Sequence, residues 1–276
     1  MLYENSYGIK KRLLFIENAI KKLQPRSVLD IGCGTGTNIT YHIAKIFPEI
    51  NFLGVDVDKS SIEFAKKNFC LKNLNFMMNE EIPENYKVDL IIASEVIEHV
   101  EKPEELMLFL KAKIHSNGIV ILTLPNGYGP SEAVRLVEIL LRIFGIYPIL
   151  MKLKQRLFKN KHRNYEDDTL AVSPHINFFS YNCICKLISN SGFRILEYKA
   201  RTFLCGFILD QCIHRLKLID WNVTISDFLP PIINSGWMFI LINSEPPKDY
   251  IYRRVLYERF RKYLNEKYYN INSKDN

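Results

Sequence analysis

The sequence predicts an α/β fold in which helices cover a doubly wound sheet of about seven strands. Two observations support this prediction. Short apolar segments alternate with stretches of helical periodicity through much of the 276-residue chain, a pattern that gives parallel strands joined by right-handed crossover helices. A glycine-rich turn also follows the first apolar segment and leads into a helix, which is a ligand-binding position in such sheets. We expect a single domain, residues 1–276, with helical insertions.

The elements follow in order from the spacing of apolar residues. Residues 7–23 have helical spacing, and Pro25 ends that helix. Short apolar runs beyond it indicate buried strands, and stretches with apolar residues three and four apart indicate helices. The predicted strands are 27–31, 51–55, 74–78, 88–93, 118–124, 193–199 and 237–243, and the predicted helices between them are 38–47, 60–71, 103–114 and 181–191.

Three segments depart from this alternation. Residues 126–174 combine an apolar helix, a basic stretch and an acidic patch, which predicts a helical lid or insertion after the fifth strand. Residues 201–235 form a second predicted insertion, after the sixth strand. Residues 248–276 place apolar side chains near one helical face between basic ones, which predicts a basic amphipathic helix and tail.

Composition excludes several classes of protein. The cysteines lack the paired spacing of a zinc site or a disulfide framework, which fits a reducing compartment. The first twenty residues interleave charged and apolar positions, unlike a secretory signal, and the most apolar stretch, residues 133–151, is interrupted by charges and a proline. We therefore expect a cytoplasmic protein. Its net charge of +7 comes largely from residues 152–163 and 248–267, which could contact anionic lipid or nucleic acid.

The segment V-L-D-I-G-C-G-T-G, residues 28–36, has the composition of a ligand-binding turn. Glycine at 32, 34 and 36 lets the backbone turn sharply and lets a ligand approach the main-chain amides, while the next helix offers unpaired N–H groups to an anion. Asp56 follows Gly36 by twenty residues, at the end of the second strand, where a carboxylate can accept from both hydroxyls of a ribose. A dinucleotide fingerprint would need a glycine where Thr37 stands.

From Val28 to about Phe193 the chain resembles class I S-adenosylmethionine-dependent methyltransferases. The resemblance implies a Rossmann-like sheet with an antiparallel last strand, and a cofactor whose ammonium group meets Asp30 and whose ribose meets Asp56. It also implies that Asn79 and Glu80 flank the adenine, although Asp is common where Asn79 stands. The cofactor-binding residues expected on this basis are Asp30, Gly32, Cys33, Gly34, Gly36, Asp56, Val57, Asn79, Glu80, Ser94 and Glu95.

The fourth strand is followed by S-E-V-I-E-H-V, without the Asn/Asp-Pro-Pro-aromatic signature of many N-methyltransferases, which favours oxygen as the methyl acceptor. With L-P-N and H-I-N-F-F-S further on, this motif resembles O-methyltransferases of quinone biosynthesis and small-RNA 2'-O-methyltransferases, some of which use divalent metal. If the motif opens a helix, Glu95 and Glu98 share one face, and a Mg²⁺ site of Glu95, Glu98, His99 and His175 is predicted. The alternatives are His99 as a metal-free general base, and a purely structural role.

The sequence says less about the identity of the methyl acceptor. Residues 133–144 form a helix with one narrow polar stripe, which suits a lid, a membrane-interface helix or a dimer contact. We expect a small apolar, lipid-linked or glycan acceptor and a protein that can lie at the membrane surface. RNA methylation and a cofactor-binding regulator without catalysis are the alternative functions.

Overall fold

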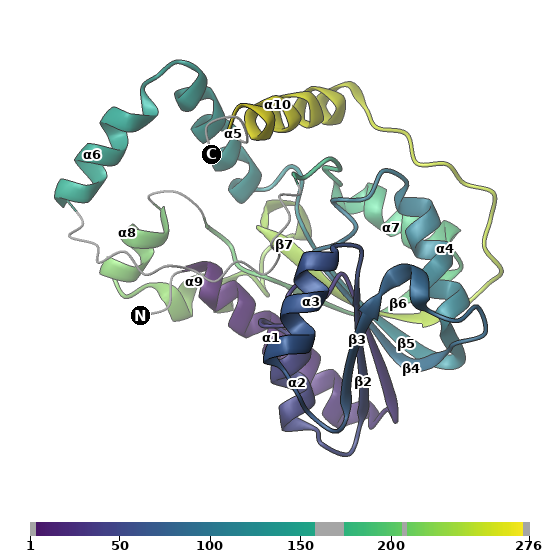
Figure 1. The fold of residues 1–276 in the computed structure, drawn as a ribbon. Coiled ribbons are helices and arrows are strands. Elements are labelled where there is room, and N and C mark those ends of the chain that lie inside the picture. The colour runs from purple at the N-terminus through teal and green to yellow at the C-terminus, as the bar shows by residue number, and fades with distance from the viewer. Residues whose placement is uncertain (1–3, 158–173, 206–208, 273–276) are drawn as a thin grey trace.

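The computed structural model describes residues 4–157, 174–205 and 209–272. Its centre is a seven-stranded sheet with the order β3-β2-β1-β4-β5-β7-β6 (Figure 1). Strands β1 to β5 are parallel, and β7 runs antiparallel between β5 and β6, so the predicted fold class is confirmed. The strand bounds are β1 Ser27–Ile31, β2 Asn51–Asp56, β3 Leu74–Met78, β4 Val88–Ser94, β5 Ile114–Pro125, β6 Phe193–Ala200 and β7 Gly236–Asn243.

Two apolar cores lie on opposite faces of the sheet. One face is covered by α1 (Glu4–Leu23), α2 (Thr40–Ile46) and α3 (Lys59–Asn68), and the other by α4 (Pro103–Lys113) and α7 (Tyr181–Asn190). Alternate residues of each parallel strand enter opposite cores, because side chains alternate across a strand; Leu29 and Val28 illustrate this. Both faces are apolar, as a covered parallel sheet requires.

Local signals set the ends of several elements. Asp58 caps α3 by accepting from the Ser61 backbone N–H at 2.9 Å. The fifth strand is longer than predicted, because it begins at Ile114 directly after α4. The helix predicted at residues 60–71 ends earlier, at Asn68. The helix predicted at residues 38–47 is shorter and covers only Thr40–Ile46.

The insertions add helices at the carboxyl edge of the parallel strands. After β5 come α5 (Pro130–Ile143) and α6 (Tyr147–Leu157). After β6 come α8 (Leu209–Arg215), α9 (Ile219–Ile225) and the short helix η2 (Pro231–Ile233). The basic stretch predicted at residues 152–163 begins within α6, and its residues 158–163 lie outside the described residues, as does the acidic patch before Pro174. No helix in the described ranges is long and apolar enough to cross a bilayer.

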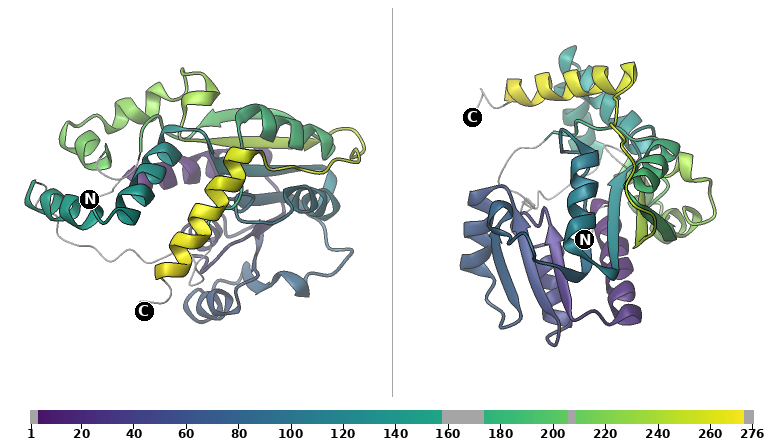
Figure 2. Two further views of the ribbon diagram at one scale, coloured as in Figure 1. Left: turned by 90° about the horizontal axis from the view of Figure 1, so that it is seen from above. Right: turned by 90° about the vertical axis from the view of Figure 1, so that its right-hand side faces the viewer.

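The C-terminal helix α10 (Leu256–Asn272) lies beside α5, and an extended segment connects it to β7 (Figure 2). Residues 251–255, which the sequence pattern included in this helix, are not helical. This placement brings α10 over the segments that follow β4 and precede α7, where the candidate site is found.

Candidate active site

The glycine turn between β1 and α2 is closed by hydrogen bonds to β2. The Gly32 and Cys33 N–H groups donate to the Val55 carbonyl at 2.8 and 3.0 Å. The Gly34 N–H donates to Asp56 Oδ2 at 2.8 Å. The structure therefore brings the turn and the acid twenty residues beyond it into direct contact, as the sequence pattern requires.

Two of these positions leave no room for a side chain. Gly32 and Gly36 have φ angles of +69° and +74°, a region that favours glycine. A Cβ on Gly32 would lie 2.4 Å from a Val96 methyl carbon, and one on Gly36 would lie 2.7 Å from the Phe76 ring. Glycine is therefore required by both the backbone and its neighbours.

The two acidic residues of this region have different surroundings. Asp30 is buried at the end of β1, where its Oδ2 accepts from the Thr40 hydroxyl at 2.6 Å. Asp56 is partly buried, and its Oδ1 accepts from the Asp58 N–H at 2.8 Å. Thr40, which the sequence analysis did not single out, thus orients one of the predicted cofactor contacts.

The remaining predicted cofactor positions lie along the same edge. Val57 is 79% exposed immediately after β2, although it is an aliphatic side chain. Asn79 and Glu80 belong to the short helix η1 (Asn79–Glu81), which directly follows β3, the neighbour of β2. Ser94 ends β4 and shares a 2.9 Å hydrogen bond with Thr123 of β5. Burial, followed by the charges of Asp30 and Asp56, raises the pKa of the Cys33 thiol.

Residues 95–100 form a turn and not the opening of a helix, which corrects the conditional expectation that Glu95 and Glu98 share a helical face. Helix α4 begins only at Pro103. Glu95 has a φ of 58°, an uncommon conformation for a residue with a side chain. The two carboxylates have different partners.

Glu95 lies between two arginines that the sequence analysis missed. Its Oε2 is 2.8 Å from an Arg201 nitrogen and its Oε1 is 3.4 Å from an Arg12 nitrogen. Burial alone would raise the pKa of Glu95, but the Arg201 and Arg12 charges outweigh it and lower the pKa to about 2. Glu95 is thus an ion-paired carboxylate and does not belong to the cluster of candidate ligands described next.

Glu98 is fully buried, and neither of its carboxylate oxygens has a hydrogen-bond partner among the residues that the structure describes. Burial, and then the nearby Glu95 charge, raises the pKa of Glu98. A buried carboxylate without a partner is costly for the fold. The Glu98 carboxylate therefore needs a proton, a cation or a polar ligand to compensate for its burial.

Two imidazoles adjoin this carboxylate. His99 Nε2 lies 3.9 Å from Glu98 Oε1, and the His99 and His175 rings are 4.8 Å apart at an interplanar angle of 76°. One potential ligand atom from each of Glu98, His99 and His175 lies within 4.8 Å of the others. Three of the four predicted metal ligands therefore come together.

The tautomer of His99 follows from its partner. Its Nδ1 is 3.1 Å from the Pro174 carbonyl, which can only accept, so Nδ1 carries the proton and Nε2 has a free electron pair. Burial, followed by the His175 charge, lowers the pKa of His99 to about 4. This ring is neutral near pH 7.

Asn177 joins the two segments of the cluster. Its side-chain amide donates to the carbonyls of Ile97 and Val100 at 2.9 and 2.7 Å. The N–H groups of Ile176 and Asn177 both donate to the Glu98 carbonyl. The H-I-N motif contained this residue, but only its histidine was singled out from the sequence.

Comparison with known proteins gives the family. A methyltransferase-domain model matches residues 2–198. A ubiquinone biosynthesis O-methyltransferase of Rickettsia canadensis is 30% identical over 216 residues, which cover 77% of each chain. The chain belongs to the class I S-adenosylmethionine-dependent methyltransferases.

Another relative matches a shorter region, and a solved structure shares the fold over most of the chain. A malonyl-[acyl-carrier protein] O-methyltransferase of Halalkalibacterium halodurans is 33% identical over 116 residues, or 40% of this chain, and the match covers 41% of that relative. The solved structure of PKMT2 from Rickettsia typhi has a TM-score of 0.54 at 18% identity, covering 86% of this chain and 52% of the other. That likeness shows the shared fold.

S-adenosylmethionine is the methyl donor of this methyltransferase. The residues at the glycine turn fit such a group on their own geometry: the turn admits no side chain at Gly32 or Gly36, and Asp56 lies against it. Asp30 offers the buried carboxylate that a cofactor ammonium group needs once it leaves water.

Proposed function

We propose that this methyltransferase transfers its methyl group to a hydroxyl oxygen of a small apolar, lipid-linked or glycan acceptor, beside the cluster of Glu98, His99 and His175. The main support is the buried Glu98 carboxylate, which lacks a hydrogen-bond partner within the described residues and lies against two imidazoles. The two relatives described above are both named as O-methyltransferases, which agrees with an oxygen acceptor. The sulfonium makes the methyl group electrophilic, so the protein has mainly to align the acceptor oxygen and exclude water.

Glu98, His99 and His175 could hold a divalent cation, which when bound would lower the pKa of an acceptor hydroxyl. The donor set fits a cation, because His99 presents an unprotonated Nε2 and the Glu98 carboxylate accepts no hydrogen bond from the described residues. Two imidazoles and one carboxylate suit Zn²⁺, Mn²⁺ or Fe²⁺ better than the Mg²⁺ expected from the sequence, since Mg²⁺ prefers oxygen ligands.

Thermal unfolding with S-adenosylhomocysteine and each of Mg²⁺, Mn²⁺ and Zn²⁺ tests the cation site. We expect a metal-dependent rise in Tm that a chelator reverses and that Glu98→Gln removes. Glu138→Gln, on α5, is the matched control, because Glu138 is ion-paired to Arg142 and lies outside the cluster. A rise that persists in Glu98→Gln would exclude this site, and activity unaffected by chelator would exclude a metal role.

His99 as a metal-free general base is the competing mechanism. The His99 Nε2 could take the proton from the hydroxyl group of the methyl acceptor. A pKa of about 4, however, makes His99 a weak base near pH 7. The two mechanisms differ in one measurement: a metal-free base predicts turnover that chelator leaves intact and that His99→Gln abolishes.

Asp56 is proposed to hold the cofactor ribose. Asp56→Ala should weaken S-adenosylhomocysteine binding by about 10-fold or more, since a bidentate carboxylate contact to hydroxyls is lost. Asp58→Ala is the control, because Asp58 caps α3 two residues further on. Equal affinities for wild type and Asp56→Ala, measured by calorimetry, would refute this role.

The helices α5 and α6 support an apolar or membrane-linked acceptor. Phe144 is 72% exposed and Ile149 68% exposed, and Val137 and Ile143 are exposed as well. A large exposed apolar surface marks a lid, a membrane contact or a protein interface. We propose that it contacts the membrane surface that delivers the acceptor.

Cosedimentation with vesicles containing one-third anionic lipid tests the membrane contact. Phe144→Ser with Ile149→Ser should reduce the bound fraction several-fold, whereas Leu196→Ser, an exposed position on β6, should not. A dimer that dissociates in the double variant would indicate that this face is a dimer interface. Strongly salt-dependent RNA binding would favour RNA as the acceptor, and cofactor binding without turnover on any acceptor would favour a regulator.

A further inference from the structure

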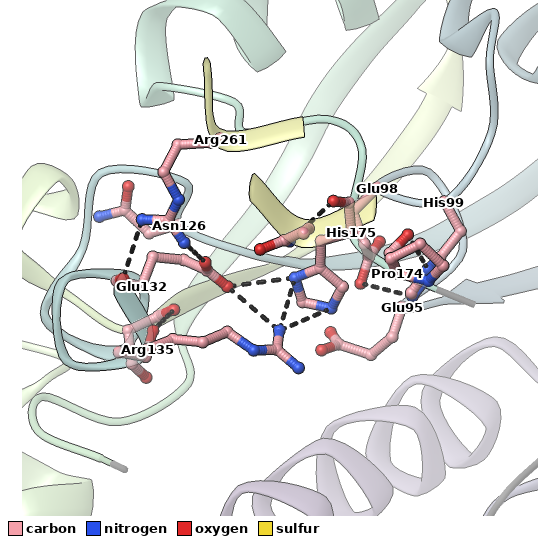
Figure 3. Close-up of polar contacts among 12 residues, drawn as sticks. Glu95, Glu98, His99, Asn126, Glu132, Arg135, Pro174, His175 and Arg261 are labelled. Carbon is pink, nitrogen blue, oxygen red and sulfur yellow. Dashed lines mark hydrogen bonds and ion pairs between the residues drawn. The ribbon is translucent and has the colours of Figure 1, made fainter. Parts of the chain in front are cut away.

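We propose that Glu132 is a positioning residue, which together with Arg261 of the C-terminal helix holds His175 in the tautomer that leaves its Nε2 unprotonated for the cluster (Figure 3). This inference rests on the proposed function, in which His175 acts beside Glu98 and His99. It assigns a part of the active site to α5 and α10.

Glu132 divides its carboxylate between two partners. It lies in the first turn of α5 and is only 3% exposed. Its Oε1 is 3.1 Å from His175 Nδ1, and its Oε2 is 2.7 Å from an Arg261 nitrogen. An ionised carboxylate can only accept, so the contact to His175 requires a proton on Nδ1.

Arg261 fixes the carboxylate in this orientation. Its side chain is fully buried, and a second guanidinium nitrogen donates to the Glu132 backbone carbonyl at 3.0 Å. The guanidinium also lies 4.7 Å from the centroid of the Phe178 ring. Both oxygens of Glu132 are therefore oriented by groups from outside α5.

Arg135 competes for the same imidazole. One of its nitrogens lies 3.0 Å from His175 Nδ1 and 3.4 Å from Nε2, and 3.6 Å from Glu132 Oε1. A guanidinium can only donate, so a bond to Nδ1 would favour the opposite tautomer. Glu132, with its buried ion pair, opposes that outcome, because imidazole ligands that face a metal commonly donate their other N–H to a carboxylate.

Helix α10 also holds the backbone of His175 in place. The side-chain amide of Asn265, on α10, donates to the His175 carbonyl at 2.9 Å. Helix α10 thus fixes both the main chain of His175 and, through Glu132, its ring. A helix near the C-terminal end of the sequence therefore supports one residue of the cluster.

The double variant Glu132→Met with Arg261→Met separates positioning from folding. Removing one partner would leave a buried charge unpaired, whereas replacing a buried ion pair by apolar groups of similar volume is often neutral. We expect the double variant to fold with a Tm above that of Glu132→Met alone. Glu138→Met with Arg142→Met, which removes a partly buried ion pair of α5 outside the cluster, is the matched control.

The readout is the tautomer of His175 in ¹⁵N-histidine-labelled protein, assigned by its loss in His175→Gln. We expect Nδ1–H in wild type and in the control, and a mixture or Nε2–H in the double variant. The Kd for Mn²⁺ alone should rise about 10- to 100-fold in the double variant, with S-adenosylhomocysteine affinity unchanged. Nε2–H in wild type, or an unchanged tautomer in the folded double variant, would overturn the inference. A wild type that binds no Mn²⁺ but shows the expected tautomer change would refute the metal proposal and support the positioning role.

Discussion

Two glutamates three residues apart show how strongly environment decides the chemistry of a side chain. Glu95 lies between arginines that keep it ionised, whereas Glu98 is buried without a hydrogen-bond partner in the described part of the chain. The left-handed backbone conformation at Glu95 sends the two side chains in different directions. One carboxylate stabilises the turn, and the other is available to a cation or a proton.

Glu95→Gln should destabilise the protein in a pH-dependent way. Its pKa is lowered from 4.5 to about 2 in the folded state, so its ion pairs contribute fully above pH 4.5 and are lost as the pH falls toward 2. The free energy of unfolding should drop by roughly 3 kcal/mol near pH 7. That difference from wild type should shrink by roughly 1 kcal/mol at pH 3.5, measured by urea unfolding at both pH values. A constant difference would mean that Glu95 is not ion-paired.

Gly36→Ala should impair cofactor binding and stability together. The left-handed backbone costs about 1–2 kcal/mol with a side chain present, and the Phe76 ring must also move. Gly145→Ala is the matched control, because Gly145 has a φ of 70° but no atom within 4 Å of the added carbon. We expect at least 10-fold weaker S-adenosylhomocysteine binding in Gly36→Ala alone. Similar affinities for both variants would disprove the crowding argument.

At the scale of elements, the active site is assembled from turns that the strands present at one edge. Parallel strands bring the ends of β1, β2 and β4 together, and the segment before α7 returns to pair with the turn after β4. Hydrogen bonds from residues 176–177 to residue 98 fix that return. The spacing of the two histidines therefore depends on a link between two loops.

Asn177→Ala should loosen this link. It removes two donated hydrogen bonds, to Ile97 and Val100, and one accepted from Arg254. We expect a loss of about 2–3 kcal/mol in the free energy of unfolding and lower kcat, because His175 would no longer be held against His99. Asn68→Ala, which removes one exposed bond within α3, should cost about 0.5 kcal/mol or less. A stable Asn177→Ala variant with full activity would contradict this account.

At the scale of the whole molecule, α10 closes the carboxyl edge from the far end of the chain. Its Arg261 pairs with Glu132 of α5, and its Lys262 pairs with Glu101 beyond the turn after β4. Helix α9 is likewise joined to α1, where Lys11 donates to the Val223 carbonyl at 2.9 Å. Long-range polar contacts thus join these added helices to one another, to α1 and to the turn after β4.

Cofactor should stabilise the molecule as one cooperative unit. At 100 times its Kd, S-adenosylhomocysteine should add about 2.7 kcal/mol to the free energy of unfolding. Calorimetry should show one transition that moves upward as a whole, since α10, α5 and the sheet share buried contacts. A second transition that the ligand leaves in place would show that the helical cover unfolds separately.

Residue patterns in the sequence were enough to predict the sheet, most helix positions and the glycine turn, because these depend on short-range periodicity and on residues with special backbone freedom. It also placed Asp56 correctly at the end of β2, since parallel strands align their ends. Family resemblance supplied the antiparallel strand that β7 proved to be.

Which polar groups meet became clear only from the three-dimensional structure. It separated Glu95 from Glu98, brought His175 to His99 and paired Glu132 with Arg261, 129 residues apart in the chain. Side-chain pairing across such distances depends on the packing of whole helices and on the direction of each turn. The sequence pattern named four candidate metal ligands, but no local pattern shows which of them meet. The folded chain groups Glu98, His99 and His175 and adds the support of His175 by Glu132.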